Sequence, residues 1–272
     1  MIEIRNLNFR YGRQPNLFED LSLSEEAGSI VGLLGKNGAG KSSLLKLIAG
    51  ALEASDQSIS VMGCSPFRRL PSFLEEICYI PEEYDLPSIR ISEYVKAYSL
   101  FYPRFDHSKL AGILTDFELD ANHNLSKLSY GQRKKFLIGF ALSTNCKLLV
   151  FDEPTNGLDI PSKSVFRKVV AGSLSDDQLV IISTHQVKDV ENLIDKIVVL
   201  DQGKVVLHKS LWEISENYSF HTSTLLDPLE SLYHDVAPGG FKVMKPANGV
   251  SSDVDIELLF NAVINGVQFN NQ

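Results

Sequence analysis

Two stretches of this 272-residue chain carry side chains that could bind and cleave a phosphate group. The first, residues 35–42, reads GKNGAGKS and matches the pattern G-x-x-x-x-G-K-[ST] at every fixed position. Its glycines let successive backbone N–H groups face phosphate oxygens, while Lys41 would reach the β- and γ-phosphates and Ser42 would hold Mg²⁺. The pattern indicates a phosphate-binding loop at the start of a helix. The alternative interpretation is a glycine-rich turn without a ligand.

The second stretch, residues 128–159, begins with a Ser-Gly turn that opens a helix and continues into an apolar strand that ends at Asp152 and Glu153. Ligands bind at the carboxyl ends of buried parallel strands, so both carboxylates are expected at a binding edge. Asp152 can hold Mg²⁺ through water, and Glu153 can take a proton from, or orient, a water that attacks the γ-phosphate. A solvated acidic turn is the alternative for such a pair.

The elements that must position these residues alternate between strand and helix, which predicts a mostly parallel α/β sheet. Between them, residues 66–126 have helical apolar spacing in two segments separated by Pro103. The expected strands are 29–34, 148–151, 179–182 and a hairpin of 197–200 with 205–207; the expected helices are 43–49, 91–101, 108–117, 132–143 and 210–217.

Taken in order, these motifs resemble those of the nucleotide-binding subunits of ATP-binding-cassette (ABC) transporters, over about residues 2–208. GKNGAGKS resembles the Walker A motif, FDEP the end of Walker B, and LSYGQ the family signature LSGGQ. Asn156-Gly157-Leu158-Asp159 resembles the D-loop, Ser183-Thr184-His185 the switch-histidine loop, and FRYG at residues 9–12 the loop whose aromatic ring stacks on adenine. The residues around Arg104 resemble bacterial export-type cassettes.

The resemblance implies a P-loop NTPase fold of ABC type. Its core is a mostly parallel sheet, with an antiparallel β-subdomain and a helical subdomain at about residues 66–126 that receives the membrane subunit. The nucleotide-binding domain is expected to span residues 1–218, followed by a small C-terminal appendage of unknown role at 219–272. In that appendage Ile256, Leu259, Phe260 and Val263 have helical spacing, which predicts a packed surface helix or, alternatively, a regulatory or dimer-contact element.

The resemblance also implies an Mg²⁺-dependent, transport-coupled ATPase that converts ATP and water to ADP and phosphate, with ATP and Mg²⁺ as cofactors. The implied catalytic residues are Glu153, His185 and Lys41. The implied nucleotide-binding residues are Tyr11, Gly35, Asn37, Gly38, Ala39, Gly40, Lys41, Ser42, Ser43, Glu82, Ser129, Gly131, Gln132 and Asp159, and the implied metal ligands are Ser42, Asp152 and Glu82.

Each of these roles has a plainer alternative. Tyr11 could be a surface aromatic at a strand end, His185 a structural histidine, and Ser129 an ordinary helix N-cap. In the family the signature faces the ATP held by a second subunit. A homodimer is therefore expected, with an integral membrane transporter subunit as the other partner.

Two positions depart from the family pattern. Tyr130 replaces the first glycine of the signature, and Glu82 replaces the glutamine that usually follows Pro81. A carboxylate can bind Mg²⁺ as an amide can, but it cannot donate a hydrogen bond when ionised. We therefore expect Glu82 to approach Mg²⁺ when the dimer is closed.

Composition limits the other classes of function. A net charge of −8 disfavours sequence-independent nucleic-acid binding, so no nucleic-acid partner is expected, and the basic run 133–135 is interpreted as a solvated helix face. Three cysteines without metal-ligand spacing suit a reducing cytosol. The longest apolar run, residues 136–142, is too short to span a bilayer, and no signal peptide is recognised. The expected location is cytoplasmic, peripheral at the inner face of the cell membrane.

Two other functions remain compatible with the motifs. One is a soluble ABC ATPase of a non-transport system, such as cofactor assembly. The other is a nucleotide-responsive regulatory protein with little or no turnover.

Overall fold

The computed structural model describes residues 1–54, 58–227, 229–247, 249 and 252–269. Its centre is a six-stranded sheet in the order β5-β6-β7-β3-β8-β9. Neighbouring strands from β5 to β8 are parallel, and β9 is antiparallel to β8 at the edge. The strands are β3 (Ser29–Leu34), β5 (Ile77–Ile80), β6 (Leu148–Asp152), β7 (Leu179–Thr184), β8 (Lys196–Asp201) and β9 (Lys204–Ser210). The mostly parallel α/β core predicted from the sequence is confirmed.

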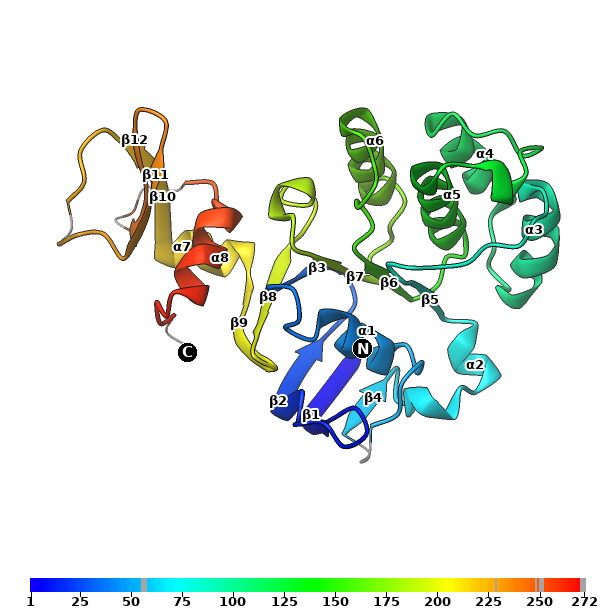
Figure 1. The fold of residues 1–272 in the computed structure, drawn as a ribbon, viewed down its shortest axis with the longest axis horizontal. Coiled ribbons are helices and arrows are strands. Elements are labelled where there is room, and N and C mark those ends of the chain that lie inside the picture. The colour runs from blue at the N-terminus through cyan, green and yellow to red at the C-terminus, as the bar shows by residue number, and fades with distance from the viewer. Residues whose placement is uncertain (55–57, 228, 248, 250–251, 270–272) are drawn as a thin grey trace.

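Successive residues of the central strands face opposite sides of the sheet, and both sides are buried. On one side Val31 and Leu33 pack with helix α1 and a second, antiparallel sheet in the order β2-β1-β4. Figure 1 shows α1 between the two sheets. The elements of this layer are α1 (Lys41–Ile48), β1 (Ile2–Phe9), β2 (Phe18–Glu25) and β4 (Ile59–Val61).

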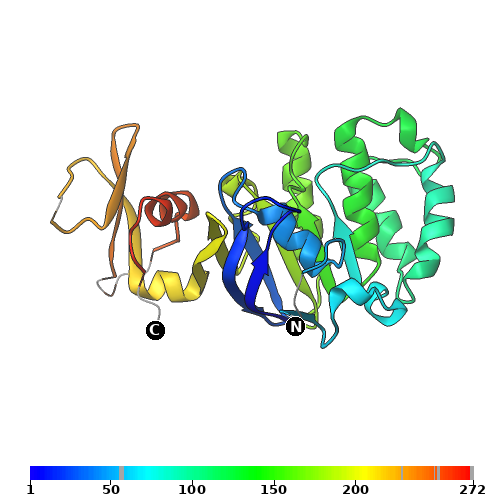
Figure 2. The ribbon, with the colours of Figure 1, turned by 60° about the horizontal axis from the view of Figure 1, so that its bottom comes forward.

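Helices cover the opposite side of the central sheet, where Leu149 and Phe151 belong to the larger core. These helices are α3 (Ile91–Tyr98), α4 (His107–Asp116), α5 (Tyr130–Ser143) and α6 (Ile160–Ala171). Figure 2 shows α3, α4 and α5 grouped at the end of the molecule away from the C-terminus. The span 66–126 also holds the short helix α2 (Pro71–Leu74) and gives β5 to the central sheet, and the domain boundaries given above remain predictions.

A separate unit follows the sheet's last strand, as Figures 1 and 2 show. It is a three-stranded antiparallel sheet, β10-β12-β11, with α8 packed beside it. The predicted helix is confirmed: Ile256, Leu259 and Val263 are buried. The sheet was not predicted. The elements are α7 (Leu211–Asn217), which leads in, β10 (Tyr218–Ser223), β11 (Tyr233–Ala237), β12 (Gly240–Pro246) and α8 (Ile256–Ile264).

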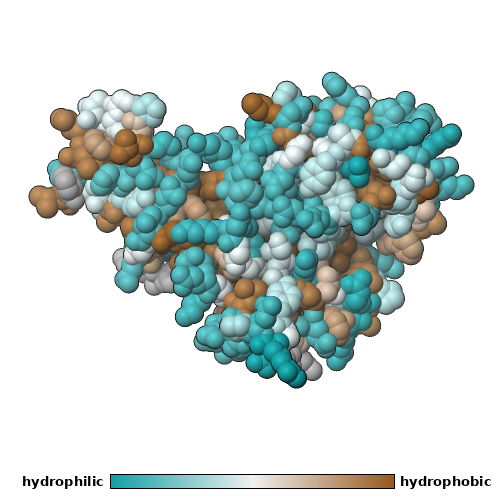
Figure 3. Space-filling model, in the orientation of Figure 1, coloured by the Kyte–Doolittle hydropathy of each residue, from teal (hydrophilic) through white to brown (hydrophobic). Residues whose placement is uncertain are grey.

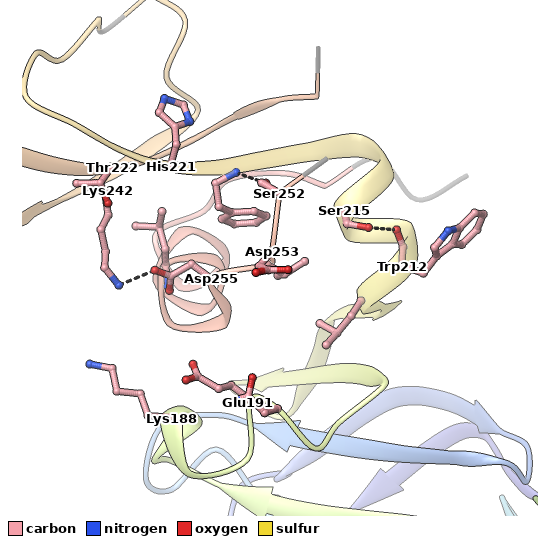
Figure 4. A pocket seen from close by; sticks show the side chains of 15 residues that line it. Lys188, Glu191, Trp212, Ser215, His221, Thr222, Lys242, Ser252, Asp253 and Asp255 are labelled. Carbon is pink, nitrogen blue, oxygen red and sulfur yellow. Dashed lines mark hydrogen bonds and ion pairs between the residues drawn. The ribbon is translucent and has the colours of Figure 1, made fainter. Parts of the chain in front are cut away.

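Helix α8 returns to the cassette and packs against β8 and the 3₁₀ turn η4 (Val187–Asp189). Its apolar residues share the larger core with Val187, and Lys188 pairs with Glu257 at 2.9 Å. A cavity of about 730 Å³ lies at this junction. Figure 4 shows Lys188 and Glu191 on the cassette side facing Asp253 and Asp255 across it. The unit is therefore attached to the cassette at two places, through α7 and through α8.

The outer end of this unit exposes apolar side chains that belong to neither core, and brown atoms gather there among paler ones in Figure 3. Leu225, Leu229 and Val236 are each more than four-fifths exposed there. Among the described residues no helix combines the length and apolar character needed to cross a bilayer.

Candidate nucleotide site

Three neighbouring strands of the central sheet end at one edge, and each is followed by predicted site residues. Strand β6 ends at Asp152 and is followed by Glu153, β7 ends at Thr184 and is followed by His185, and β3 leads into the loop that begins at Gly35. Because β7 lies between β6 and β3, all three ends meet. Asp152 is directly in register with Ser183, whose hydroxyl donates to Asp152 Oδ1 at 2.5 Å.

The loop at residues 35–42 has the tight conformation that its glycines predict. Gly40 has a φ of 105°, and a Cβ there would come within 2.7 Å of the Phe18 ring, so this position requires glycine. The ammonium of Lys41 donates to the carbonyls of Gly35 (2.8 Å) and Lys36 (3.3 Å). Burial lowers the pKa of Lys41, and nearby carboxylates, Glu153 first among them, oppose that shift.

The Glu153 carboxylate is buried and oriented. His185 Nδ1 donates to Oε1 at 2.8 Å, since an ionised carboxylate only accepts, and Lys41 Nζ lies 4.0 Å from the same oxygen. Oε2 is buried without a hydrogen-bond partner among the described residues. The backbone is fixed as well, because Glu153 has a φ of 46° and its N–H donates to Ser183. One carboxylate oxygen is thus held while the other is free to accept a proton.

A cavity of about 550 Å³ lies in front of these groups. Most of the predicted site residues line it: Tyr11, Asn37, Gly38, Gly40, Lys41, Ser42, Ser43, Glu82, Glu153 and His185. Sequence reasoning missed the adjoining wall at residues 14–17, for which the only signal was its proximity to Tyr11. Gly35, Ala39 and Asp152 are buried and are not among the residues that line it.

Tyr11 stands at the mouth of this cavity with 40% of its surface exposed. Its hydroxyl lies 2.9 Å from Ser43 Oγ, and its ring meets that of Phe9 edge-on with centroids 5.0 Å apart. These contacts fix the ring while leaving part of it available for stacking on a planar ligand.

The side chains expected to hold Mg²⁺ offer oxygen atoms, as that ion prefers. Ser42 and Glu82 line the cavity, and Glu82 Oε1 also accepts from Asn156 Nδ2 at 3.0 Å. Asp152 is buried behind them and already accepts from Ser183. Among the residues that the structure describes, no three His, Cys, Asp or Glu side chains form a ready metal cage. This set fits a cation that takes part of its shell from water and substrate phosphates.

The signature residues lie outside this cavity. Ser129 caps α5, accepting from Gln132 N at 3.2 Å, while Gln132 Oε1 accepts from Ser129 N at 3.0 Å. A Cβ on Gly131 would lie 2.6 Å from the carbonyl oxygen of Gly157, so close packing requires the glycine. Asp159 likewise caps α6 through Ser162 N at 3.0 Å, and hydrogen bonding to the side chain and the backbone of Ser162 lowers the pKa of Asp159. Within one chain the polar groups of Ser129, Gln132 and Asp159 form helix-capping hydrogen bonds and do not face the cavity.

One sequence-based interpretation is wrong. The basic run 133–135 was expected to be a solvated helix face, but Lys134 is completely buried. It lies on the side of α5 that faces the turn after β6 and the loop that carries Glu82. A run of basic residues predicts exposure to solvent, but the loops that pack against α5 bury this lysine.

Comparisons with known proteins agree with this geometry. The family described as ABC transporter matches residues 18–156. The ABC transporter ATP-binding protein YtrB of Bacillus subtilis (strain 168) is 27% identical over 223 residues, covering 80% of this chain and 75% of that protein. A solved ATP-binding subunit of an ABC transporter has a TM-score of 0.72 at 26% identity, covering 78% of this chain and 91% of its own.

A further solved structure shows the shared fold at 20% identity and a TM-score of 0.68, covering 78% of this chain and 99% of its own. It is described as a dimeric post-hydrolysis state of the ATP-binding cassette MJ0796 bound to ADP and Pi. The family match takes in more than half of this chain, from β2 through the phosphate loop and the signature to Asn156. The chain therefore belongs to the ABC transporter family, as an ATP-binding cassette.

Proposed function

We propose that two copies of this chain bind two ATP molecules at a shared interface, and that hydrolysis drives a membrane-embedded transporter subunit. The proposal is carried by the separation, within one chain, of the catalytic residues from the signature residues. Lys41, Glu153 and His185 meet at one cavity, whereas Ser129 and Gly131 lie outside it. A second chain would supply its signature to this cavity, and the first would supply its signature in return. The dimeric cassette of the same fold supports this arrangement.

In the proposed reaction water attacks the γ-phosphorus of ATP and ADP leaves with the bridging oxygen. Glu153 takes the proton of that water on its unpartnered Oε2, and His185 keeps the carboxylate in place. Lys41 must exchange its two loop carbonyls for phosphate oxygens, which its flexible side chain allows. The loop N–H groups and the start of α1 stabilise the negative charge.

The proposed metal ligands are Ser42, Asp152 through water, and Glu82. Mg²⁺, when bound, neutralises charge on the phosphates and holds them for in-line attack. Among the described residues no cluster of three His, Cys, Asp or Glu side chains able to hold a metal ion is present, so the proposed ion would complete its shell with water and phosphate oxygens.

The transporter partner is proposed to dock on the helical subdomain. A groove of about 770 Å³ runs between α2, β5, α3 and the 3₁₀ turn Ser99–Phe101, and its lining is mostly apolar. Leu100 and Phe101, which line it, are 81% and 66% exposed. An amphipathic helix from an internal loop of the membrane subunit fits such a groove. This docking would hold the cassette at the inner face of the membrane.

Glu153→Gln tests the proposed function. Glutamine keeps the shape of the side chain and can accept from His185, but it cannot take a proton. We expect hydrolysis to fall by about a hundredfold or more while ATP binding persists, so that the ATP-bound dimer accumulates in light scattering after size exclusion. Glu25→Gln is the matched control, because Glu25 is equally buried and lies 2.8 Å from His208, outside the cavity.

Two results would contradict the proposal. One is normal steady-state turnover by Glu153→Gln. The other is a specific activity of the wild type that stays constant down to high dilution while the protein is monomeric, because a shared site requires the rate to rise faster than linearly with concentration.

A further inference from the structure

Lys134 lies in the second turn of α5, and its ammonium faces main-chain oxygens rather than water. Nζ donates to the carbonyl of Glu82 at 3.1 Å and to that of Glu153 at 3.4 Å. It also lies 5.2 Å and 5.5 Å from the ring centroids of Tyr84 and Tyr130. Within the described part of the chain it has no carboxylate within ion-pair distance.

Tyr84 and Tyr130 close this pocket from outside. Their rings are stacked, with centroids 5.7 Å apart and planes 17° from parallel. The Tyr130 hydroxyl donates to the carbonyl of Glu82 at 2.9 Å, and the Tyr84 hydroxyl donates to the carbonyl of Tyr130 at 3.2 Å. Tyr130 and Lys134 are four residues apart and share one face of α5, so both reach the same carbonyl. Tyr130, which replaces the first glycine of the family signature, thus supplies a ring and a hydroxyl that glycine lacks.

The stability of the fold does not require a lysine at position 134. Burial lowers the pKa of Lys134, and only the more distant charges of Glu82, Asp152 and Glu153 oppose that effect. A well-packed apolar side chain usually stabilises such a position as well as a buried charge does. Both carbonyls would also keep another donor without it: Tyr130 for Glu82, and the N–H of Asn156 at 3.3 Å for Glu153.

What Lys134 adds is a link between three segments. It joins the signature helix to the loop of Glu82 and to the backbone of Glu153, the residue whose left-handed φ of 46° sets the direction of its carboxylate. A shift of α5 would therefore move the carbonyl on which this direction depends. The ammonium also contributes positive charge behind the buried carboxylates.

We propose that Lys134 is a positioning residue for ATP hydrolysis, and that it transmits engagement of the signature helix by the second subunit to Glu153. The proposal rests on the proposed function. Tyr84 and Tyr130 exclude water from the link, which strengthens its hydrogen bonds. ATP itself is held elsewhere, by the loop at 35–42, so binding and hydrolysis respond differently to the loss of Lys134.

The test compares Lys134→Met with wild type in steady-state ATPase kinetics and thermal unfolding. Methionine keeps the length of the side chain and removes charge and donors. We expect kcat to fall by about tenfold or more, KM for ATP to stay within about twofold, and the unfolding midpoint to stay within about 3 °C or rise. Lys135→Met is the matched control on the same helix, with kinetics like wild type. Tyr130→Phe removes one hydroxyl and should lower kcat by a smaller factor, about twofold to fivefold.

Wild-type kcat in a folded Lys134→Met would overturn the inference, as would a loss of activity that a rise in KM for ATP accounts for in full. If Lys134→Met does not fold, Tyr130→Phe decides the question through its own split between kcat and KM, and an unchanged kcat would overturn the inference. Failure of the proposed function is distinct, because it would show as absent ATPase activity in wild type or as full activity in Glu153→Gln.

Discussion

Replacing His185 by alanine tests how the Glu153 carboxylate is held. The substitution leaves Oε1 with only Lys41 at 4.0 Å, beyond hydrogen-bond range, and Oε2 still without a partner. A hydrogen bond to an ionised group contributes about 1.5–3 kcal/mol. The lower end applies, because the His185 side chain is 37% exposed and water can enter the space. Misorientation of Glu153 alone should therefore lower kcat by about tenfold.

A direct contact of His185 with the γ-phosphate would increase that loss to between about a hundredfold and a thousandfold. KM for ATP should change little in either case, because the loop at 35–42 is untouched. The assay is phosphate release at saturating ATP and Mg²⁺. His208→Ala is the control: His208 lies 2.8 Å from buried Glu25 and is 35% exposed, nearly the same as His185, but outside the cavity. It should alter stability without altering kcat.

A kcat of His185→Ala within twofold of wild type would refute this reasoning, since Glu153 would then be oriented without the imidazole. An equal loss of kcat in His208→Ala would also refute it, because the effect would then reflect general stability rather than the site.

Glu82→Ala should raise the Mg²⁺ concentration needed for half-maximal turnover by about threefold to tenfold, measured by titration of Mg²⁺ at fixed ATP; an unchanged titration would remove Glu82 from the metal ligands. Truncation after residue 218 should lower the unfolding midpoint by about 5 °C or more, because it uncovers the apolar surface beneath α8; an unchanged midpoint in calorimetry would contradict this. A thiol reagent should label Cys64 alone in the native protein at pH 8. Burial raises the pKa of the Cys78 thiol to about 12 and also raises that of Cys146. Rapid labelling of all three cysteines, detected by mass spectrometry, would argue against the packing described.

The parts of the site that depend on local backbone geometry could be predicted from the sequence. The loop at 35–42 and the ends of β6 and β7 follow from glycine spacing and from short apolar runs buried on both faces. Residues whose role depends on distant partners could not be predicted. The burial of Lys134 depends on Tyr84, fifty residues away in sequence, and nothing in a basic run indicates it.

The sheet of the C-terminal unit was missed for a different reason. In strand β11 (Tyr233–Ala237) Asp235 is half-buried and Val236 is exposed, so residue type does not alternate with burial as it does in a typical half-buried strand. The Pro-Gly-Gly sequence directly after it resembles loop composition. Helix α8 was recognised because four of its apolar residues fall on one face, which is a stronger pattern.

The return of α8 to η4 has a consequence for how the chain is made. Turn η4 begins two residues after His185, yet the helix that covers it is encoded some seventy residues later. A nascent chain that has completed β7 and β8 therefore still presents Val187 without its final cover. The region beside the histidine reaches its mature packing only after residues 256–264 have been synthesised and have folded back. Full packing of the cassette beside η4 therefore waits for residues 256–264 rather than for the last of its motifs.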